Sequence, residues 1–283
     1  LNPRLWFDKK YRDRQRFIWD TGFHWGEWLE PGQGGPLALN WFFFRSMLYR
    51  FGMKTSFSPV VATAYFANSA RMLAKIAKTL GETEDAQKYY ALAEQVKAAY
   101  IEEFIGKDGR INPDRQASYV RVLEFDLAPK ELKAQILGHL IRLIRAAGNH
   151  IGTGFLSTPF ICHVLSENGR IDVAYDLLNQ KTIPSWLYPI TKGATTIWET
   201  WEGISVDNKP QMSLNHFSPG SVVNLLHRKV AGINMTEPGY KQITIQPMPG
   251  GGLTAVKADY ESVHGLIGVG WAQESNRMTM KVV

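Results

Sequence analysis

Two carboxylates stand beside two indoles in the stretch 193–203, and these residue types are suited to carbohydrate chemistry. Within the stretch, Glu199 follows Trp198 directly and Glu202 follows Trp201. The flat apolar face of an indole can lie against the C–H face of a sugar ring while a nearby carboxylate holds a water or a hydroxyl. The stretch therefore indicates a carbohydrate site, with all four residues as candidates.

A helix start is the alternative interpretation of the same stretch. Thr195 or Thr196 would then be the N-cap, Glu199 the acid of a capping box, and the two tryptophans part of the core. The flanking Gly193 and Gly203, together with a second tryptophan and glutamate cluster upstream, favour the site.

That second cluster lies at residues 21–32, where the sequence reads TGFHWGEWLEPG. Its glycines and mixed polar and aromatic residues predict a structured loop, and loops of this composition are typical of functional sites. In one interpretation, the tryptophans and glutamates of this loop belong to a functional site. In the alternative, the two tryptophans plug the core while Glu27 and Glu30 face solvent.

Composition narrows the class of protein. The chain has 283 residues, of which 45% are hydrophobic and 20% charged, as expected for a globular chain with one large core or a main domain and a small companion. No apolar stretch is long enough to span a bilayer. The single cysteine, Cys162, excludes an internal disulfide and indicates a reducing compartment, so the predicted location is cytoplasmic.

The basic character of the chain does not indicate nucleic acid or a membrane surface as a partner. The net charge is +6, and the densest basic run lies at residues 9–16, which we interpret as a solvated face. Elsewhere the basic residues alternate with acids, and no nucleic-acid motif accompanies them. The seven histidines are dispersed without ligand spacing, so neither a metal nor another cofactor is expected.

Helical hairpins dominate the first part of the chain. Apolar residues recur at helical spacing, for example Met72, Ile76 and Leu80, and Gly81 ends that run. The predicted helices cover residues 37–51, 58–80, 83–105, 116–126, 129–147, 159–167, 171–180 and 218–231. Residues 184–189 are expected to be an extended connection. Paired helices with short turns on one side and long loops on the other predict a toroid.

After Gly232 the pattern changes to alternating and β-branched residues. Strands are predicted at 240–246, 253–260, 266–271 and 277–283. We therefore divide the chain into a helical domain at 1–232 and a small antiparallel sheet domain at 233–283. The last strand stops at the final residue, so the sheet looks cut.

Several motifs together resemble a known family. Taken in order and spacing, they are similar to bacterial α-L-rhamnosidases of glycoside hydrolase family 78 from about residue 21 to the end. The motifs are VVATAYFANSAR at 60–71, TGFLSTP at 153–159, LSENGR at 165–170, GATTIWE at 193–199, NHF at 215–217 and EPGY at 237–240. The resemblance implies an (α/α)6-barrel followed by a β-sandwich, and inverting hydrolysis of terminal α-L-rhamnosides.

The resemblance also implies roles for single residues. Glu199 matches the family's general base, which activates the attacking water, and His216 matches a histidine that contacts the sugar. Trp25, Trp28 and Trp186 would line the pocket with Trp198, Trp201 and Glu202.

One departure concerns the general acid. Glu27 stands where the family has the aspartate of a Gly-Asp-Trp motif. The family's general acid comes from an upstream segment that nothing here matches, and about half of the barrel helices would be missing with it. Glu27 or Glu30 would then have to reach the far side of the pocket.

Two alternatives belong to other classes. The chain could be a carbohydrate-binding or interaction fragment whose barrel is completed by an upstream segment or by another chain, including a second copy in a homo-oligomer. It could also be a different toroid enzyme, such as a trehalase-like hydrolase or a polysaccharide lyase. A lyase would need tyrosine, histidine and arginine around an acidic sugar, whereas tryptophan and glutamate suit a neutral deoxy sugar.

Overall fold

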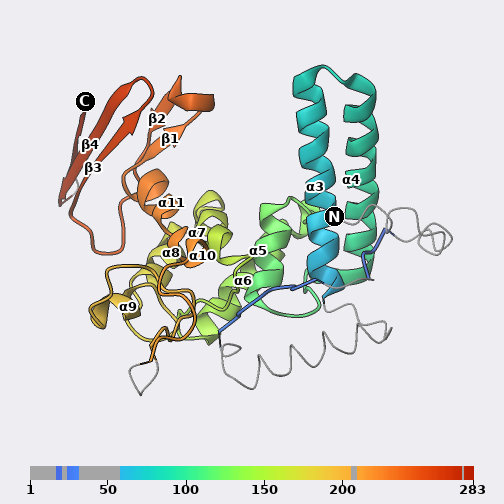
Figure 1. The fold of residues 1–283 in the computed structure, drawn as a ribbon, viewed down its shortest axis with the longest axis horizontal. Helices are drawn as coiled ribbons and strands as arrows, with labels where there is room; N and C mark the ends of the chain where they lie inside the picture. The colour runs from blue at the N-terminus through green and yellow to red at the C-terminus, as the bar shows by residue number, and fades with distance from the viewer. Residues whose placement is uncertain (1–16, 21–23, 32–57, 205–208, 276) are drawn as a thin grey trace. The chain divides into compact units, whose positions relative to one another are not determined.

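The computed structural model describes residues 17–20, 24–31, 58–204, 209–275 and 277–283 (Figure 1). The predicted helix at 37–51 and the basic run at 9–16 lie outside the described residues. The chain forms two compact units, one from Leu1–Ala146 with Gly152–Ser157, the other from Ala147–Ile151 with Thr158–Val283. Each unit is described by itself.

The first unit contains a long antiparallel hairpin of α3 (Pro59–Leu80) and α4 (Thr83–Phe104) (Figure 1). Pro59 opens α3, and Gly81 ends it in the left-handed region at φ 81°, as the sequence predicted. Ser58 occupies the N-cap position without a side-chain capping bond.

The buried stripe of α3 agrees with the prediction at Val61 and Ala64 but differs from it towards the C-terminal end of the helix. It consists largely of alanines, whereas Met72, Ile76 and Leu80 are exposed. The buried alanines include Ala67, Ala70, Ala74 and Ala77. Small side chains let two helices approach closely, so hydrophobicity alone misjudged which face packs.

A second hairpin in the same unit is formed by α5 (Gln116–Glu124) and α6 (Lys133–Ala146), the latter preceded by a 3-10 turn at Lys130–Leu132. Helix α6 buries Ile136, Leu140 and Ile144 at a spacing of four, as an amphipathic helix does. In α5 nearly every side chain is buried, including Arg121. A buried arginine requires partners, and these are described below.

The second unit begins with the hairpin of α7 (Thr158–Glu167) and α8 (Ile171–Leu178), joined through Gly169 at φ 73°. Two predictions were wrong in the region that follows. Residues 184–189 are not all extended, because α9 (Leu187–Thr191) starts within them. The continuous helix at 218–231 is instead α10 (Phe217–Gly220), α11 (Val223–Leu225) and a π turn at Leu226–Val230. Pro219 and Gly220 interrupt it, since proline lacks an amide donor and glycine is a poor helix former.

Two antiparallel sheets complete this unit (Figure 1). Strand β1 (Ile233–Met235), which the sequence did not predict, pairs with β2 (Ile243–Ile245). Strands β3 (Ala255–Ser262), β4 (Gly265–Glu274) and β5 (Arg277–Val282) form a meander. The core between the sheets contains Ala231, Ile233, Ile267 and Val269.

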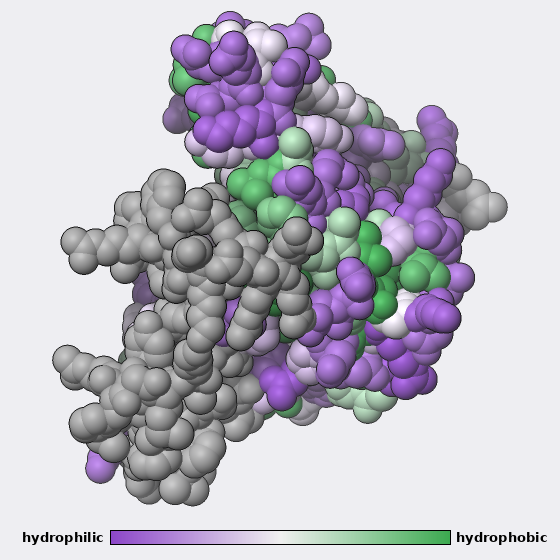
Figure 2. All heavy atoms as spheres, turned by 90° about the vertical axis from the view of Figure 1, so that its right-hand side faces the viewer, coloured by the Kyte–Doolittle hydropathy of each residue, from purple (hydrophilic) through white to green (hydrophobic). Residues whose placement is uncertain are grey.

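The predicted fold class, mainly helical hairpins followed by a small antiparallel sheet region, is confirmed. Figure 2 shows hydrophilic residues over much of the described surface on the face it presents, with hydrophobic residues scattered between them. Among the described helices, none has both the length and the apolar character that a membrane crossing requires.

Candidate functional site

The tryptophan and glutamate stretch is one side of an irregular antiparallel hairpin in the second unit. The His216 amide donates to Ile197 O at 2.9 Å, the Glu199 amide to Ser213 O at 2.9 Å, and the Gln211 amide to Gly203 O at 2.7 Å. Residues 193–203 contain no helix, so the alternative of a helix start is wrong. This backbone pairing places Glu199 and His216 on neighbouring segments.

The Glu199 carboxylate is oriented by a main-chain donor. The Ser213 amide donates to Glu199 Oε2 at 2.9 Å, and the preceding Met212 has a positive φ of 62°. Within the described part of the chain, this is the one donor to that carboxylate, and Glu199 is half-buried. One oxygen is therefore fixed while the other can accept a hydrogen bond from a water. Glu202 lies on the same segment and is also half-buried.

His216 is held in one orientation by the start of α10. Its Nδ1 accepts from the Ser218 amide at 3.2 Å, so the neutral ring carries its proton on Nε2. The ring stacks on Phe217 with centroids 4.9 Å apart. This arrangement suits donation from Nε2 to a hydroxyl group.

The three indoles of this unit that were predicted to line the site lie in its core. Trp186, Trp198 and Trp201 are only 2%, 4% and 7% exposed. Trp186 packs edge to face on Trp201 at 5.7 Å and donates from Nε1 to Pro219 O at 2.8 Å. These buried indoles anchor the hairpin in the core. Their contact with a sugar stays a prediction.

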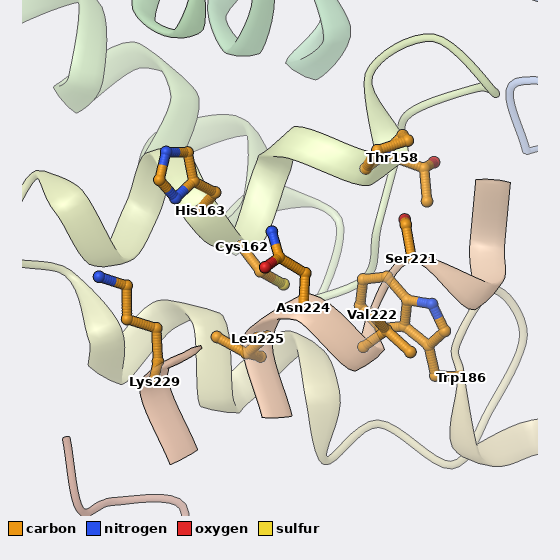
Figure 3. A pocket seen from close by; sticks show the side chains of 10 residues that line it. Thr158, Cys162, His163, Trp186, Ser221, Val222, Asn224, Leu225 and Lys229 are labelled. Atoms are coloured by element: carbon orange, nitrogen blue, oxygen red, sulfur yellow. The ribbon is translucent and has the colours of Figure 1, made fainter. Parts of the chain in front are cut away.

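A small cavity lies beside Trp186, between α7 and the segment that contains α10 and α11 (Figure 3). Cys162, His163, Ser221 and Asn224 are among its lining residues. Its space admits about one water molecule, so it is too small for a sugar ring. Burial raises the pKa of the Cys162 thiol to about 12, which leaves this cysteine protonated and unreactive.

The loop at residues 24–31 carries the other predicted group, in the first unit. Trp25 is 54% exposed and packs edge to face on the half-buried Trp28 at 4.8 Å. Glu27 and Glu30 point inward instead, with side chains only 6% and 9% exposed. The alternative, in which the tryptophans plug the core and the glutamates face solvent, is therefore wrong for both glutamates and for Trp25.

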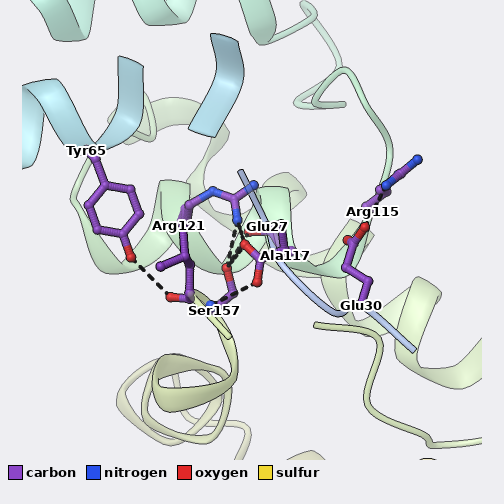
Figure 4. Close-up of polar contacts among 8 residues, drawn as sticks. Glu27, Glu30, Tyr65, Arg115, Ala117, Arg121 and Ser157 are labelled. Atoms are coloured by element: carbon purple, nitrogen blue, oxygen red, sulfur yellow. Dashed lines mark hydrogen bonds and ion pairs between the residues drawn. The ribbon is translucent and has the colours of Figure 1, made fainter. Parts of the chain in front are cut away.

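The Glu27 carboxylate accepts hydrogen bonds from three donors (Figure 4). Oε1 accepts from the Ser157 amide at 3.0 Å, and Oε2 accepts from Ser157 Oγ at 2.9 Å and from Arg121 Nη1. Arg121 is 2% exposed and also donates to Ser157 Oγ at 2.8 Å. Sequence reasoning missed both partners. A single arginine within the apolar run of residues 117–123 was the signal available.

Glu30 is the second buried acid of this loop. Its Oε2 pairs with Arg115 Nη1 at 2.6 Å (Figure 4). Burial raises the pKa of Glu30 above its usual value, and the opposing charge of Arg115, which is more than half exposed, does not cancel that effect.

Comparison with known proteins identifies the family. The family model described as the bacterial alpha-L-rhamnosidase 6 hairpin glycosidase domain matches residues 4–230, and that of the bacterial alpha-L-rhamnosidase C-terminal domain matches residues 232–283. The chain belongs to the bacterial α-L-rhamnosidases. The six-hairpin rhamnosidase domain agrees with the predicted (α/α)6-barrel.

Rhamnosidase relatives match most of this chain. An α-L-rhamnosidase of Streptomyces avermitilis is 42% identical over 76% of the chain and 21% of its own length. One from Alteromonas sp. is 35% identical over 91% of the chain and 27% of its own length. The chain thus spans about a quarter of the length of these relatives.

Solved structures of rhamnosidases share the fold. The crystal structure of Streptomyces avermitilis α-L-rhamnosidase complexed with L-rhamnose aligns with a TM-score of 0.81 at 34% identity, covering 96% of this chain and 25% of that one. Native α-L-rhamnosidase from Aspergillus terreus aligns with a TM-score of 0.80 at 28% identity, covering 92% and 29%.

The raised pKa of Glu30 predicts how its contribution to stability changes with pH. The folded state holds the Glu30 proton more tightly than the unfolded state, so this contribution to the free energy of unfolding falls as pH rises above about 4.3. The contribution becomes constant once the pH exceeds the pKa of Glu30 in the folded state. It is measured by urea unfolding of the wild type and of Glu30→Gln from about pH 4 to about pH 7. The stability of the wild type relative to the variant should decline; an increase with pH would contradict the prediction.

Gly203 and Gly193 offer a matched pair for testing the hairpin. Both have positive φ, so Gly→Ala should cost about 1–2 kcal/mol at each. A Cβ at Gly203 would lie 1.7 Å from the Trp198 ring, while at Gly193 nothing lies within 4 Å. Gly203→Ala should therefore cost about 1–3 kcal/mol more. The free energy of unfolding of both variants is measured with denaturant. Equal losses in the two variants would contradict the close packing of the Trp198 ring on Gly203.

Proposed function

We propose that this chain is part of the machinery that hydrolyses terminal α-L-rhamnosides with inversion, with Glu199 as the general base. The observation that carries the proposal is the Glu199 carboxylate, fixed through one oxygen by the Ser213 amide and placed in one hairpin with His216. Membership of the family supports it, as does the L-rhamnose complex of the Streptomyces avermitilis relative.

Inversion requires a base that deprotonates a water while an acid protonates the leaving oxygen on the opposite face. Glu199 takes the water proton as the water oxygen bonds to the anomeric carbon and the bond to the leaving oxygen breaks. His216 donates from Nε2 to a sugar hydroxyl. A base that is already oriented avoids reorganisation during the reaction.

The predicted sugar contacts are mainly aromatic. In the first unit, Trp25 is exposed and packs on the half-buried Trp28, and an exposed indole suits the C–H face of a deoxy sugar. In the second unit, the predicted contacts are Trp186, Trp198, Trp201 and Glu202. The general acid is the open role, and Glu27 is the candidate that the sequence supplied.

The proposed chemistry determines the cofactor and the partner, while other predictions are independent of it. Hydrolysis by two carboxylates uses no cofactor, and the partner is a rhamnoside. The cytoplasmic location and the division of the chain at 232 and 233 stay predictions, as does assembly with a second copy.

Glu199→Gln provides the direct test. Removal of a general base should lower the hydrolysis of an aryl α-L-rhamnoside about 10²–10⁴-fold, because the attacking water loses its proton acceptor. Binding of L-rhamnose, measured by calorimetry, should persist. Glu261→Gln, an exposed residue of β3, is the matched control and should keep full activity. The first product, observed by NMR, should be β-L-rhamnose.

Two outcomes would contradict the proposal. Undiminished hydrolysis by Glu199→Gln would remove Glu199 from the base role, and α-L-rhamnose as the first product would remove inversion. Binding of L-rhamnose without hydrolysis by the wild type would instead favour a carbohydrate-binding fragment.

A further inference from the structure

Beneath the loop that carries Trp25 and Trp28 lies a buried cluster of Arg121, Glu27 and Ser157 (Figure 4). We propose that Arg121 and Ser157 are positioning residues for the two tryptophans, acting through Glu27, which is a tether of the loop and not the proton donor. This inference rests on the proposed function, in which the indole pair contacts the sugar.

The loop is fixed at two successive residues. The Glu27 side chain is held by Arg121 from α5 and by Ser157 from the segment 152–157. The carbonyl of Trp28 accepts from the Phe155 amide at 2.8 Å. Two anchors on adjacent residues define both the position and the direction of the backbone between Trp25 and Trp28.

The fit between the two segments leaves no free space. A Cβ at Gly154 would lie 2.3 Å from Trp28 O and 3.1 Å from Glu27 Cγ. Tyr65 from α3 supports the same segment, since its hydroxyl donates to Leu156 O at 3.2 Å. Burial and the nearby Glu27 charge raise the pKa of Tyr65 to about 12, so this donor keeps its proton.

The geometry also argues against Glu27 as a proton donor. Each of its oxygens already accepts from a donor: Oε1 from the Ser157 amide, Oε2 from Ser157 Oγ and Arg121. These three donors occupy three of the roughly four lone-pair positions of the carboxylate, which leaves one position on Oε1 for a proton. Ser157 Oγ can donate elsewhere, to Ala117 O at 3.3 Å, but Arg121 and the amide cannot accept.

The buried charges depend on one another. Arg121 and Glu27 are almost completely removed from solvent, and a buried charge is tolerated where an opposite charge and hydrogen bonds compensate for lost hydration. Removing either partner leaves the other uncompensated, so the loop should leave its position. The effect should reach Trp25 and Trp28 although neither indole is changed.

The test uses the full chain with Glu27→Gln, Ser157→Ala and Arg121→Met. Ser157→Ala keeps both charges, so it stays informative if Arg121→Met does not fold. Arg142→Gln is the matched control because it removes a more exposed ion pair of the same unit, with Asp114, away from the loop. Hydrogen exchange of residues 24–31 and of the Phe155 amide gives a readout that needs no activity. The other two measurements are the affinity for L-rhamnose and the rate of hydrolysis of rhamnosides with good and with poor leaving groups.

All three variants, and not Arg142→Gln, should exchange faster in the loop and at Phe155, and should bind L-rhamnose more weakly. The kcat/KM should fall by about 10²-fold, as for a misplacement of about 1 Å, to the same extent for good and poor leaving groups. Normal exchange and affinity in Glu27→Gln, with a loss confined to poor leaving groups, would make Glu27 the acid and overturn the proposal.

Unchanged exchange in Ser157→Ala and Arg121→Met would overturn it as well. Failure of the proposed function has a different signature, namely a wild type that does not bind or hydrolyse rhamnosides. In that case the exchange data still decide whether the cluster holds the loop.

Discussion

The first unit depends on a buried ion pair between Arg121 and Glu27, with Ser157 bridging the two groups. It connects an exposed aromatic loop to a helix almost entirely enclosed by the core. Such a pair contributes more to specificity of arrangement than to net stability, since desolvation offsets much of the attraction. Its effect is to hold the Glu27 carboxylate inward, while Trp25 in the same loop stays exposed.

The two predicted groups are positioned by different means. In the loop at 24–31, side chains anchor a short backbone segment through charge. In the hairpin of 197–204 and 210–216, the backbone pairs with itself and buried indoles support it, while Glu199 and His216 are each oriented by a main-chain amide. A carboxylate oriented by an amide interacts with a neutral dipole, so its negative charge is not neutralised by a counter-ion.

The sequence predicted most of the helical hairpins because Pro59, Gly81 and Gly169 mark boundaries that local physics enforces. It could not predict which face of α3 packs, since alanines and larger apolar residues both recur at helical spacing along it. Only the small alanine side chains let the partner helix approach closely. Glu199 and His216 could be predicted as candidates from their side chains, whereas the contact with Ser213 could not, because a main-chain amide donor does not depend on the type of side chain. Arg121 could be recognised as unusual, but Glu27, its partner 94 positions away, could not.

The Ser213 contact has a consequence for how this site can change over generations of substitution. Since the donor to Glu199 belongs to the main chain, nineteen of the twenty residues at position 213 retain it, and proline alone abolishes it. The Ser213 side chain has a separate task, since its Oγ donates to Asn215 O at 2.8 Å and accepts from the Asn215 amide at 3.1 Å. A substitution at position 213 therefore removes the bonds of this turn while the donor to Glu199 remains.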